Sequence, residues 1–182
     1  MADNSEPTRE EKIADALRAA PAYIADSATV VDSDMTTVLR EGSPDWTCVP
    51  TPPGTPKPAP MCLDPTMVQW FRELEQGKTP TIKRIGISYM LMGEVGADFD
   101  NPMATEPPEG KAGPHVMFVF PEGTGRILQG VPHDTTSGLP YVRPIPGAEP
   151  LLVVPVARPG EKVCGAEATA PVTATARQQF HA

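Results

Sequence analysis

The stretch RIGISYMLMGE, residues 84–94, decides the fold that the sequence predicts. Apolar residues occupy both parities of its strand-like part, roughly 84–93, which is typical of a strand covered on both faces. A second stretch, GPHVMFVFP at residues 113–121, predicts another strong strand at roughly 115–120. The chain is therefore expected to build a sheet around these two strands.

The remaining strand signals are shorter and lie on either side. They are the arms of a β-hairpin at roughly 36–41 and 45–49 around a Gly-Ser-Pro turn, a weak strand at 140–143, and a last strand in LLVVPVA at 151–157. Pro155 marks the last of these as an edge strand or a bulge, because proline has no N–H to donate to a neighbouring strand. Residues 22–34 are expected to be a mixed connector.

Two helices carry local start signals. Thr8 and Glu11 form a T-x-x-E capping box before an amphipathic helix expected at 9–20. Asp64 caps a second helix that has Pro65 at its first position and ends at Gly77.

Together these signals predict one α+β domain over residues 8–158. Two helices would pack on a small, mainly antiparallel sheet of five or six strands. A disordered start at 1–7 and a mobile Ala/Thr-rich tail at 159–182 are expected to flank this domain.

Proline is the extreme of the composition, with 24 among 182 residues against a usual share of about 5%. Six of these prolines fall in residues 50–60, which predicts a stiff, extended polyproline-II connector. The same segment is also compatible with a ligand for a proline-binding module. A net charge of −8 argues against a nucleic-acid partner or an anionic membrane, and no apolar run approaches the roughly 20 residues of a membrane span.

The cysteines and the first residues leave the compartment open. The polar, acidic start predicts a cytoplasmic protein as written, or a periplasmic or secreted one if a signal peptide has been removed. Cys48 and Cys62 bracket the proline-rich segment, and a bridge between them would close a loop of about 15 residues. A disulfide and two reduced thiols are both compatible with this spacing.

Several fragments together resemble a known family. They are W-T-C at 46–48, M-C-L-D at 61–64, Y-M-L-M-G at 89–93 and G-P-H-V-M at 113–117. Their joint occurrence is similar to a family of uncharacterised bacterial proteins, many of which carry secretory signals. The resemblance implies no activity and no catalytic residue. An exported location is the one property that it suggests.

The leading functional candidate is His115, which stands at the start of a strand beside the long loop 94–112. A histidine titrates near neutral pH and suits acid–base chemistry. Tyr89, Glu94 or Asp98 would orient it or share the proton. This pattern predicts a small-molecule-binding domain or an enzyme whose pocket lies at the strand ends under that loop. The imidazole would face the pocket, and a loop carboxylate would raise its pKa.

Two alternatives stay open. Met90, Met92, His115 and Met117 form a set of soft ligands that suits Cu(I), which would make the protein a periplasmic copper-handling one. A non-catalytic interaction domain would instead use the proline-rich segment 50–60. The sequence has no zinc-binding pair, no nucleophile-elbow motif and no phosphate-binding glycine loop. It therefore indicates no particular cofactor, and it does not indicate the oligomeric state.

Overall fold

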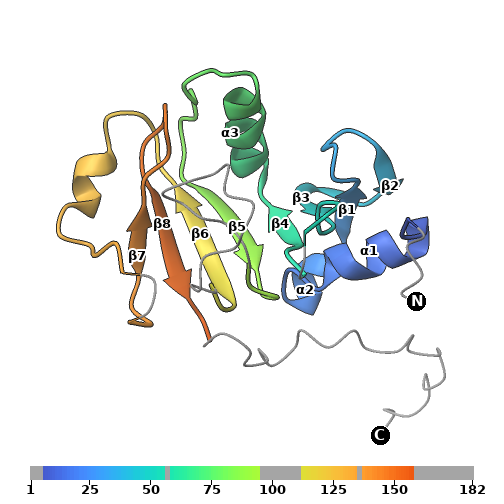
Figure 1. Ribbon diagram of the computed structural model, residues 1–182. Helices are drawn as coiled ribbons and strands as arrows, with labels where there is room; N and C mark the ends of the chain where they lie inside the picture. The colour runs from blue at the N-terminus through green and yellow to red at the C-terminus, as the bar shows by residue number, and fades with distance from the viewer. Residues whose placement is uncertain (1–5, 56–57, 95–111, 135–136, 158–182) are drawn as a thin grey trace, which may run out of the picture.

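Eight strands form one sheet in the computed structural model, which describes residues 6–55, 58–94, 112–134 and 137–157. The strands are β1 (Ala28–Val31), β2 (Val38–Arg40), β3 (Ser43–Val49), β4 (Met61–Leu63), β5 (Gly86–Met90), β6 (His115–Val119), β7 (Tyr141–Arg143) and β8 (Leu151–Pro155). Their order across the sheet is β2-β1-β3-β4-β5-β6-β8-β7, visible from right to left in Figure 1. All neighbours are antiparallel except β1 and β3. The predicted α+β class and the mainly antiparallel sheet are confirmed, whereas the expected five or six strands are too few.

The two predicted helices begin where the sequence signals place them, at α1 (Arg9–Leu17) and α3 (Pro65–Glu75), although α1 ends three residues before the predicted residue 20. A third helix, α2 (Ala22–Ala25), and a short 3-10 helix, η1 (Gly125–Leu128), were not predicted. The hydroxyl of Thr8 accepts from the N–H of Glu11 and the Glu11 carboxylate accepts from the N–H of Thr8, which completes the capping box of α1. The Asp64 carboxylate likewise accepts from the N–H of Met67 at the start of α3.

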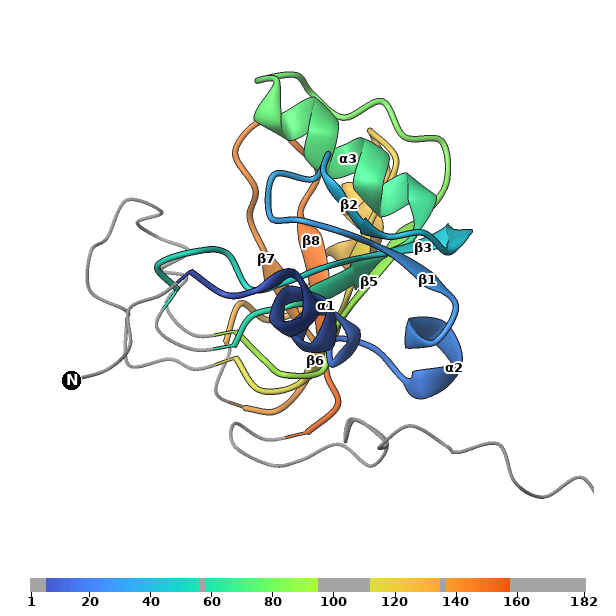
Figure 2. The same ribbon diagram turned by 90° about the vertical axis from the view of Figure 1, so that its right-hand side faces the viewer.

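The two longer helices lie on opposite faces of the sheet. Figure 2 shows the strands passing between α3 and α1. On the α3 side, the core contains Val31, Met35, Val49, Ala59, Leu63, Met67, Val68, Trp70, Ile82, Met90, Met117, Val119, Tyr141, Leu151 and Val153. On the α1 side, a second core contains Ala16, Ala19, Ala20, Ile24, Ala28, Val30, Leu39, Cys48 and Cys62. Burial on both faces explains why the central strands lack a simple polar–apolar alternation.

The predicted hairpin between residues 36–41 and 45–49 is wrong. β2 and β3 do not pair with each other, because β1 lies between them, antiparallel to β2 and parallel to β3. The segment predicted as a connector at 22–34 thus supplies both α2 and an inner strand. Gly42 permits the close approach, since a Cβ there would collide with the carbonyl oxygen of Ala28.

Strand ends also differ from the sequence prediction. β5 ends at Met90, and the next two residues form a turn. β8 is an inner strand between β6 and β7, so Pro155 does not mark an edge strand. Pro155 pairs only with His115 on β6. The pairing between β7 and β8 ends at Val153, so no residue of β7 stands opposite Pro155. An inner strand can therefore contain this proline although it has no N–H to donate.

A disulfide joins Cys48 on β3 to Cys62 on β4, directly across the antiparallel pair. The segment between these strands is therefore a loop that reverses the chain direction, and its first part turns instead of following the predicted extended polyproline-II backbone. In its described part, the N–H of Thr55 donates to the carbonyl of Pro52, and Gly54 adopts a left-handed φ of 79° at the turn. The N–H of Ala59 donates to the Thr51 hydroxyl and ties the two arms together.

The domain boundaries predicted at the two ends fall largely on residues outside the described ranges. The predicted mobile tail at 159–182 and most of the predicted disordered start at 1–7 lie outside these ranges. In the part of the chain that the structure describes, no helix has the length and apolar character needed to cross a membrane.

Candidate functional site

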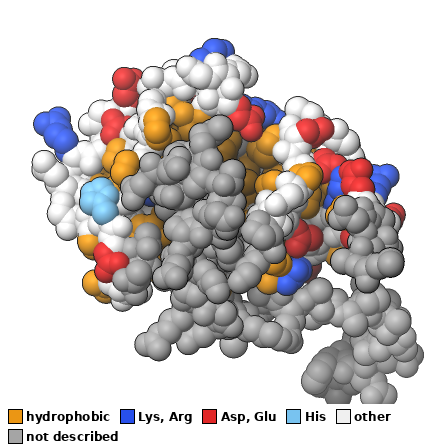
Figure 3. All heavy atoms as spheres, in the orientation of Figure 1, with side chains coloured by type: hydrophobic (Ala, Val, Ile, Leu, Met, Phe, Trp, Pro, Cys, Tyr) orange, Lys and Arg blue, Asp and Glu red, His pale blue; other side chains and the backbone are white. Residues whose placement is uncertain are grey.

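A pocket of about 400 Å³ lies between α3, the β3–β4 connection and the α3-side face of the sheet. We refer to it as the apolar pocket, because all but three of its lining side chains are apolar. The lining residues are Pro52, Thr55, Ala59, Met61, Trp70, Phe71, Leu74, Met90, Glu94, Met117, Arg143, Ile145 and Leu151. On the face drawn in Figure 3, apolar side chains reach the surface on either side of the residues shown in grey.

The secondary structure brings these side chains together. Residues at alternate positions of a strand share a face, and Met90, Met117 and Leu151 all project toward α3. Trp70 and Leu74 stand four residues apart on α3, so they lie on the same side of the helix. The rings of Trp70 and Phe71 meet edge to face, with centroids 5.1 Å apart. The wall formed by α3 is therefore aromatic, and the wall formed by the sheet is rich in methionine.

The charged lining groups form an ion pair. The Arg143 guanidinium on β7 lies 3.4 Å from the Glu94 carboxylate, and each side chain is only 19% exposed. Glu94 is held by the backbone, since its N–H donates to the carbonyl of Ala112 at 2.9 Å. Burial lowers the pKa of Arg143, while the nearby Glu94 raises it. The pocket thus presents one acceptor and one donor that together carry no net charge.

His115 lies beside this pair but inside the core. Its side chain is only 2% exposed, and its Nδ1 lies 2.7 Å from the carbonyl oxygen of Gly113. A carbonyl only accepts, so Nδ1 carries the proton in this contact. Burial lowers the pKa of His115, outweighing the opposite effect of Glu94. The prediction of a pocket-facing imidazole with a raised pKa is therefore wrong, because desolvation is the larger influence.

Tyr89 does not join His115. The register pairs Tyr89 with Val116 and Met90 with His115, so the phenol and the imidazole project from opposite faces of the sheet. Tyr89 packs on Trp46 with ring centroids 5.5 Å apart. Burial raises the pKa of Tyr89. Of the three groups expected to assist His115, Glu94 is therefore near it, Tyr89 is on the other face, and Asp98 lies outside the described residues.

The soft-ligand set is brought together in part. Met90 stands directly opposite His115 in the β5–β6 ladder, and Met117 shares their face. Met92 instead lies in the turn after β5, because the strand is shorter than predicted. Within the described ranges no group of three or more His, Cys, Asp or Glu side chains has a metal-binding arrangement.

Sequence reasoning missed Arg143 and Tyr141. Both come from β7 and interact electrostatically with Glu94, 49 and 47 positions away in the chain. Burial raises the pKa of Tyr141. The weak strand at 140–143 was the only signal near them, and it carried no functional motif.

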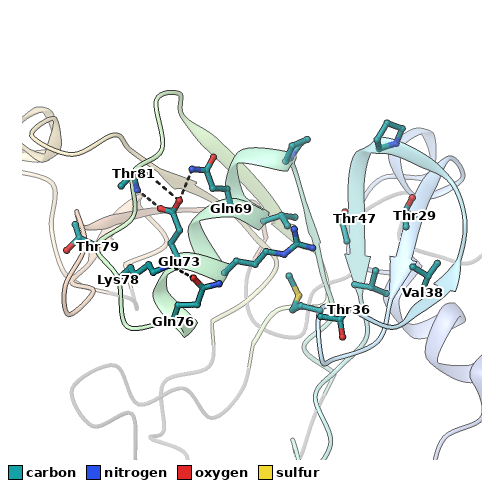
Figure 4. Close-up of a pocket in the computed structure, with 16 residues that line it drawn as sticks. Thr29, Thr36, Val38, Thr47, Gln69, Glu73, Gln76, Lys78, Thr79 and Thr81 are labelled. Carbon is teal, nitrogen blue, oxygen red and sulfur yellow. Dashed lines mark hydrogen bonds between the residues drawn. The ribbon is translucent and has the colours of Figure 1, made fainter.

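A second, larger cavity of about 980 Å³ separates α3 from the outer strands β1, β2 and β3. We refer to it as the polar groove. Figure 4 shows Thr29, Thr47 and Val38 on one wall and Gln69, Glu73 and Gln76 on the other. Its lining comprises Thr29, Val31, Met35, Thr36, Val38, Pro44, Thr47, Pro65, Val68, Gln69, Arg72, Glu73, Gln76, Lys78, Thr79 and Thr81.

Comparison with known proteins finds no matching family model, no matching curated protein and no matching solved structure.

Proposed function

We propose that the protein binds a small, mainly apolar molecule in the apolar pocket. The observation that carries this proposal is the combination of a cavity of about 400 Å³, a mainly apolar lining and one half-buried ion pair. Ligand pockets commonly have volumes of about 300–1,000 Å³ and combine apolar walls with a few polar groups that orient the ligand. The apolar pocket has both properties.

The ion pair favours a ligand with a neutral polar group. Arg143 donates to Glu94, so the pair brings one charge of each sign to the pocket. A hydroxyl or an amide can donate to Glu94 and accept from Arg143 without adding charge to a poorly hydrated site. A ligand carboxylate would instead place a second negative charge beside Glu94. We therefore expect phenols, alcohols or amides to bind more tightly than the matching acids.

The proposal assigns no catalytic step to His115. Its side chain is almost fully buried, and its Nδ1–H is already bound to Gly113. An acid–base role stays a prediction from the sequence. An interaction role for the proline-rich segment also stays a prediction.

The test is a titration of the full chain with 4-butylphenol, 4-butylbenzoate and butylbenzene, followed by amide chemical shifts. We expect the phenol to bind most tightly, with the largest shifts at Met90, Glu94 and Arg143. Ile145→Trp should fill the pocket and weaken phenol binding by about tenfold or more, which corresponds to about 1.4 kcal/mol.

Ile127→Trp is the matched control, because Ile127 is 66% exposed and does not line the pocket. It should leave the affinity for the phenol unchanged. Equal binding to the Ile145→Trp variant and the native chain would overturn the proposal, as would shifts confined to residues outside the pocket.

Copper binding is a second candidate, supported by the direct pairing of Met90 with His115. A histidine that donates from Nδ1 keeps Nε2 available as a ligand, a common arrangement at metal sites. Titration with Cu(I) in competition with bicinchoninate tests it. Met90→Leu and Met117→Leu should each weaken binding, whereas Met92→Leu should not. Unchanged competition by both variants would reject this candidate.

A further inference from the structure

The polar groove is separate from the apolar pocket, since the two cavities share no lining residue. One wall comes from β1 and β3, where Thr29 and Thr47 are paired in the ladder and line the same cavity. The other wall comes from α3, whose residues 68, 69 and 72 line the groove. Residue 72 is four positions after 68 and three after 69, so the three residues occupy one side of the helix. The groove is therefore the part of the sheet face that α3 leaves uncovered.

Neutral hydrogen-bonding groups are the most numerous kind in this lining. Threonine and glutamine side chains contribute seven of its residues, namely Thr29, Thr36, Thr47, Gln69, Gln76, Thr79 and Thr81. Buried apolar side chains, among them Val31, Met35 and Val68, complete it. Such a surface can bind the hydroxyl groups of a ligand on one side and its C–H groups on another.

The charges in the groove have different roles. The Glu73 carboxylate accepts from Gln69 Nε2 at 2.9 Å and from the Thr81 hydroxyl at 3.1 Å, and it also accepts from the Thr81 backbone N–H. These hydrogen bonds lower the pKa of Glu73. Lys78 donates to Gln76 at 2.7 Å. Glu73 therefore holds the segment after α3 against the helix, and Lys78 bonds within that segment.

Arg72 is not engaged in this way. Among the described residues, its guanidinium has no hydrogen-bond or ion-pair partner. The groove contains Arg72 and Lys78 against Glu73, so its lining has an excess of positive charge although the chain carries a net −8. A guanidinium presents parallel N–H groups that match the oxygens of a carboxylate or a phosphate.

We propose that the polar groove binds a hydroxyl-rich organic anion, in the manner of a sugar acid or a sugar phosphate. Arg72 holds the anionic group, while Thr29, Thr47 and Gln69 bind the hydroxyl groups of the body. The shared chemistry is an oxyanion on a polyhydroxylated body, and carboxylate and phosphate are its two sources. This site is independent of the apolar pocket.

The experiment is a titration of the full chain at low salt with glucose 6-phosphate, glucuronate, glucose and inorganic phosphate, followed by amide chemical shifts. We expect at least one of the two sugar anions to shift the amides of Thr29, Thr47 and Arg72, and the tighter one identifies the anionic group. Glucose and inorganic phosphate should each bind at least about tenfold more weakly than the tighter sugar anion. Glucose lacks the anionic group that Arg72 holds, and phosphate lacks the hydroxyl-bearing body.

Variants separate this site from general charge effects. Arg72→Gln should reduce the affinity for the sugar anion by about tenfold or more, and Arg72→Lys should restore part of it. Arg126→Gln is the matched control, because Arg126 is an exposed arginine on η1 outside the groove. Equal losses from Arg72→Gln and Arg126→Gln would overturn the proposal. Binding of glucose as tight as that of both anions, or no shift with any probe, would also overturn it.

Discussion

Removal of the Cys48–Cys62 disulfide should lower the stability of the fold by about 3 kcal/mol. The two cysteines are 14 positions apart, and closing a loop of about 15 residues removes roughly 3 kcal/mol of chain entropy from the unfolded state. Both side chains are fully buried in the α1-side core, so reduction would not expose them to solvent in the folded protein. The effect should therefore appear chiefly in the unfolded state.

The assay is urea unfolding of the native chain and of a Cys48→Ala/Cys62→Ala double variant. The free energy of unfolding should fall by about 3 kcal/mol, and the dependence on urea should steepen, because the uncrosslinked chain exposes more surface when it unfolds. Native chain in reductant should behave like the variant. Cys164→Ala is the control and should leave both quantities unchanged. A loss below about 1 kcal/mol with an unchanged urea dependence would refute the reasoning.

Three further predictions concern single residues. Ser88→Ala should leave stability unchanged or raise it by up to about 1 kcal/mol, because the buried Ser88 hydroxyl has no hydrogen-bond partner in the described structure; a clear loss in urea unfolding would show that the hydroxyl is satisfied. The imidazole of His115 should titrate below its usual pKa of about 6.5 in a proton NMR titration. The stability that His115 contributes should be fully present above a pH of about 6.5 and should decline as the pH falls below it, since the unfolded chain binds the proton more readily. The variant His115→Asn should weaken this decline, and a variant with the same pH profile as the native chain would contradict the prediction. Gly42→Ala should destabilise the fold by more than about 1 kcal/mol, because its Cβ would collide with the backbone carbonyl of Ala28; an unchanged melting temperature would show that β1 can shift without cost.

Local signals in the sequence predicted the helix starts well. The capping box of Thr8 and Glu11 and the cap at Asp64 each involve residues within three positions of one another, so no tertiary information is needed. The insertion of β1 between β2 and β3 had no such signal. The parallel pairing of β1 with β3 depends on contacts between residues far apart in the chain. The turn residues at 42–44 are compatible both with a hairpin, in which β2 and β3 pair, and with the observed sheet, in which β1 separates them.

The site was predictable only in part for the same reason. Glu94 was named because it is a carboxylate of the long loop predicted to lie beside His115. Arg143, its partner, is 49 positions away and carried no motif of its own. The prediction that Tyr89 assists His115 was wrong because it depends on the register between β5 and β6. Met90 pairs with His115, so Tyr89 projects from the opposite face of the sheet. A shift of one residue in this register would place Tyr89 on the same face as His115.

The most direct test of the apolar pocket as a binding site is the position of a bound ligand. Nuclear Overhauser effects should be measured between the butyl protons of 4-butylphenol and the methyl groups of the full chain. Contacts of the butyl chain with Met90 and Met117, and of the ring with Leu151, would place the ligand where these side chains line the cavity. Contacts only with exposed residues such as Ile127, or none at saturating phenol, would contradict the proposal that this cavity binds apolar molecules.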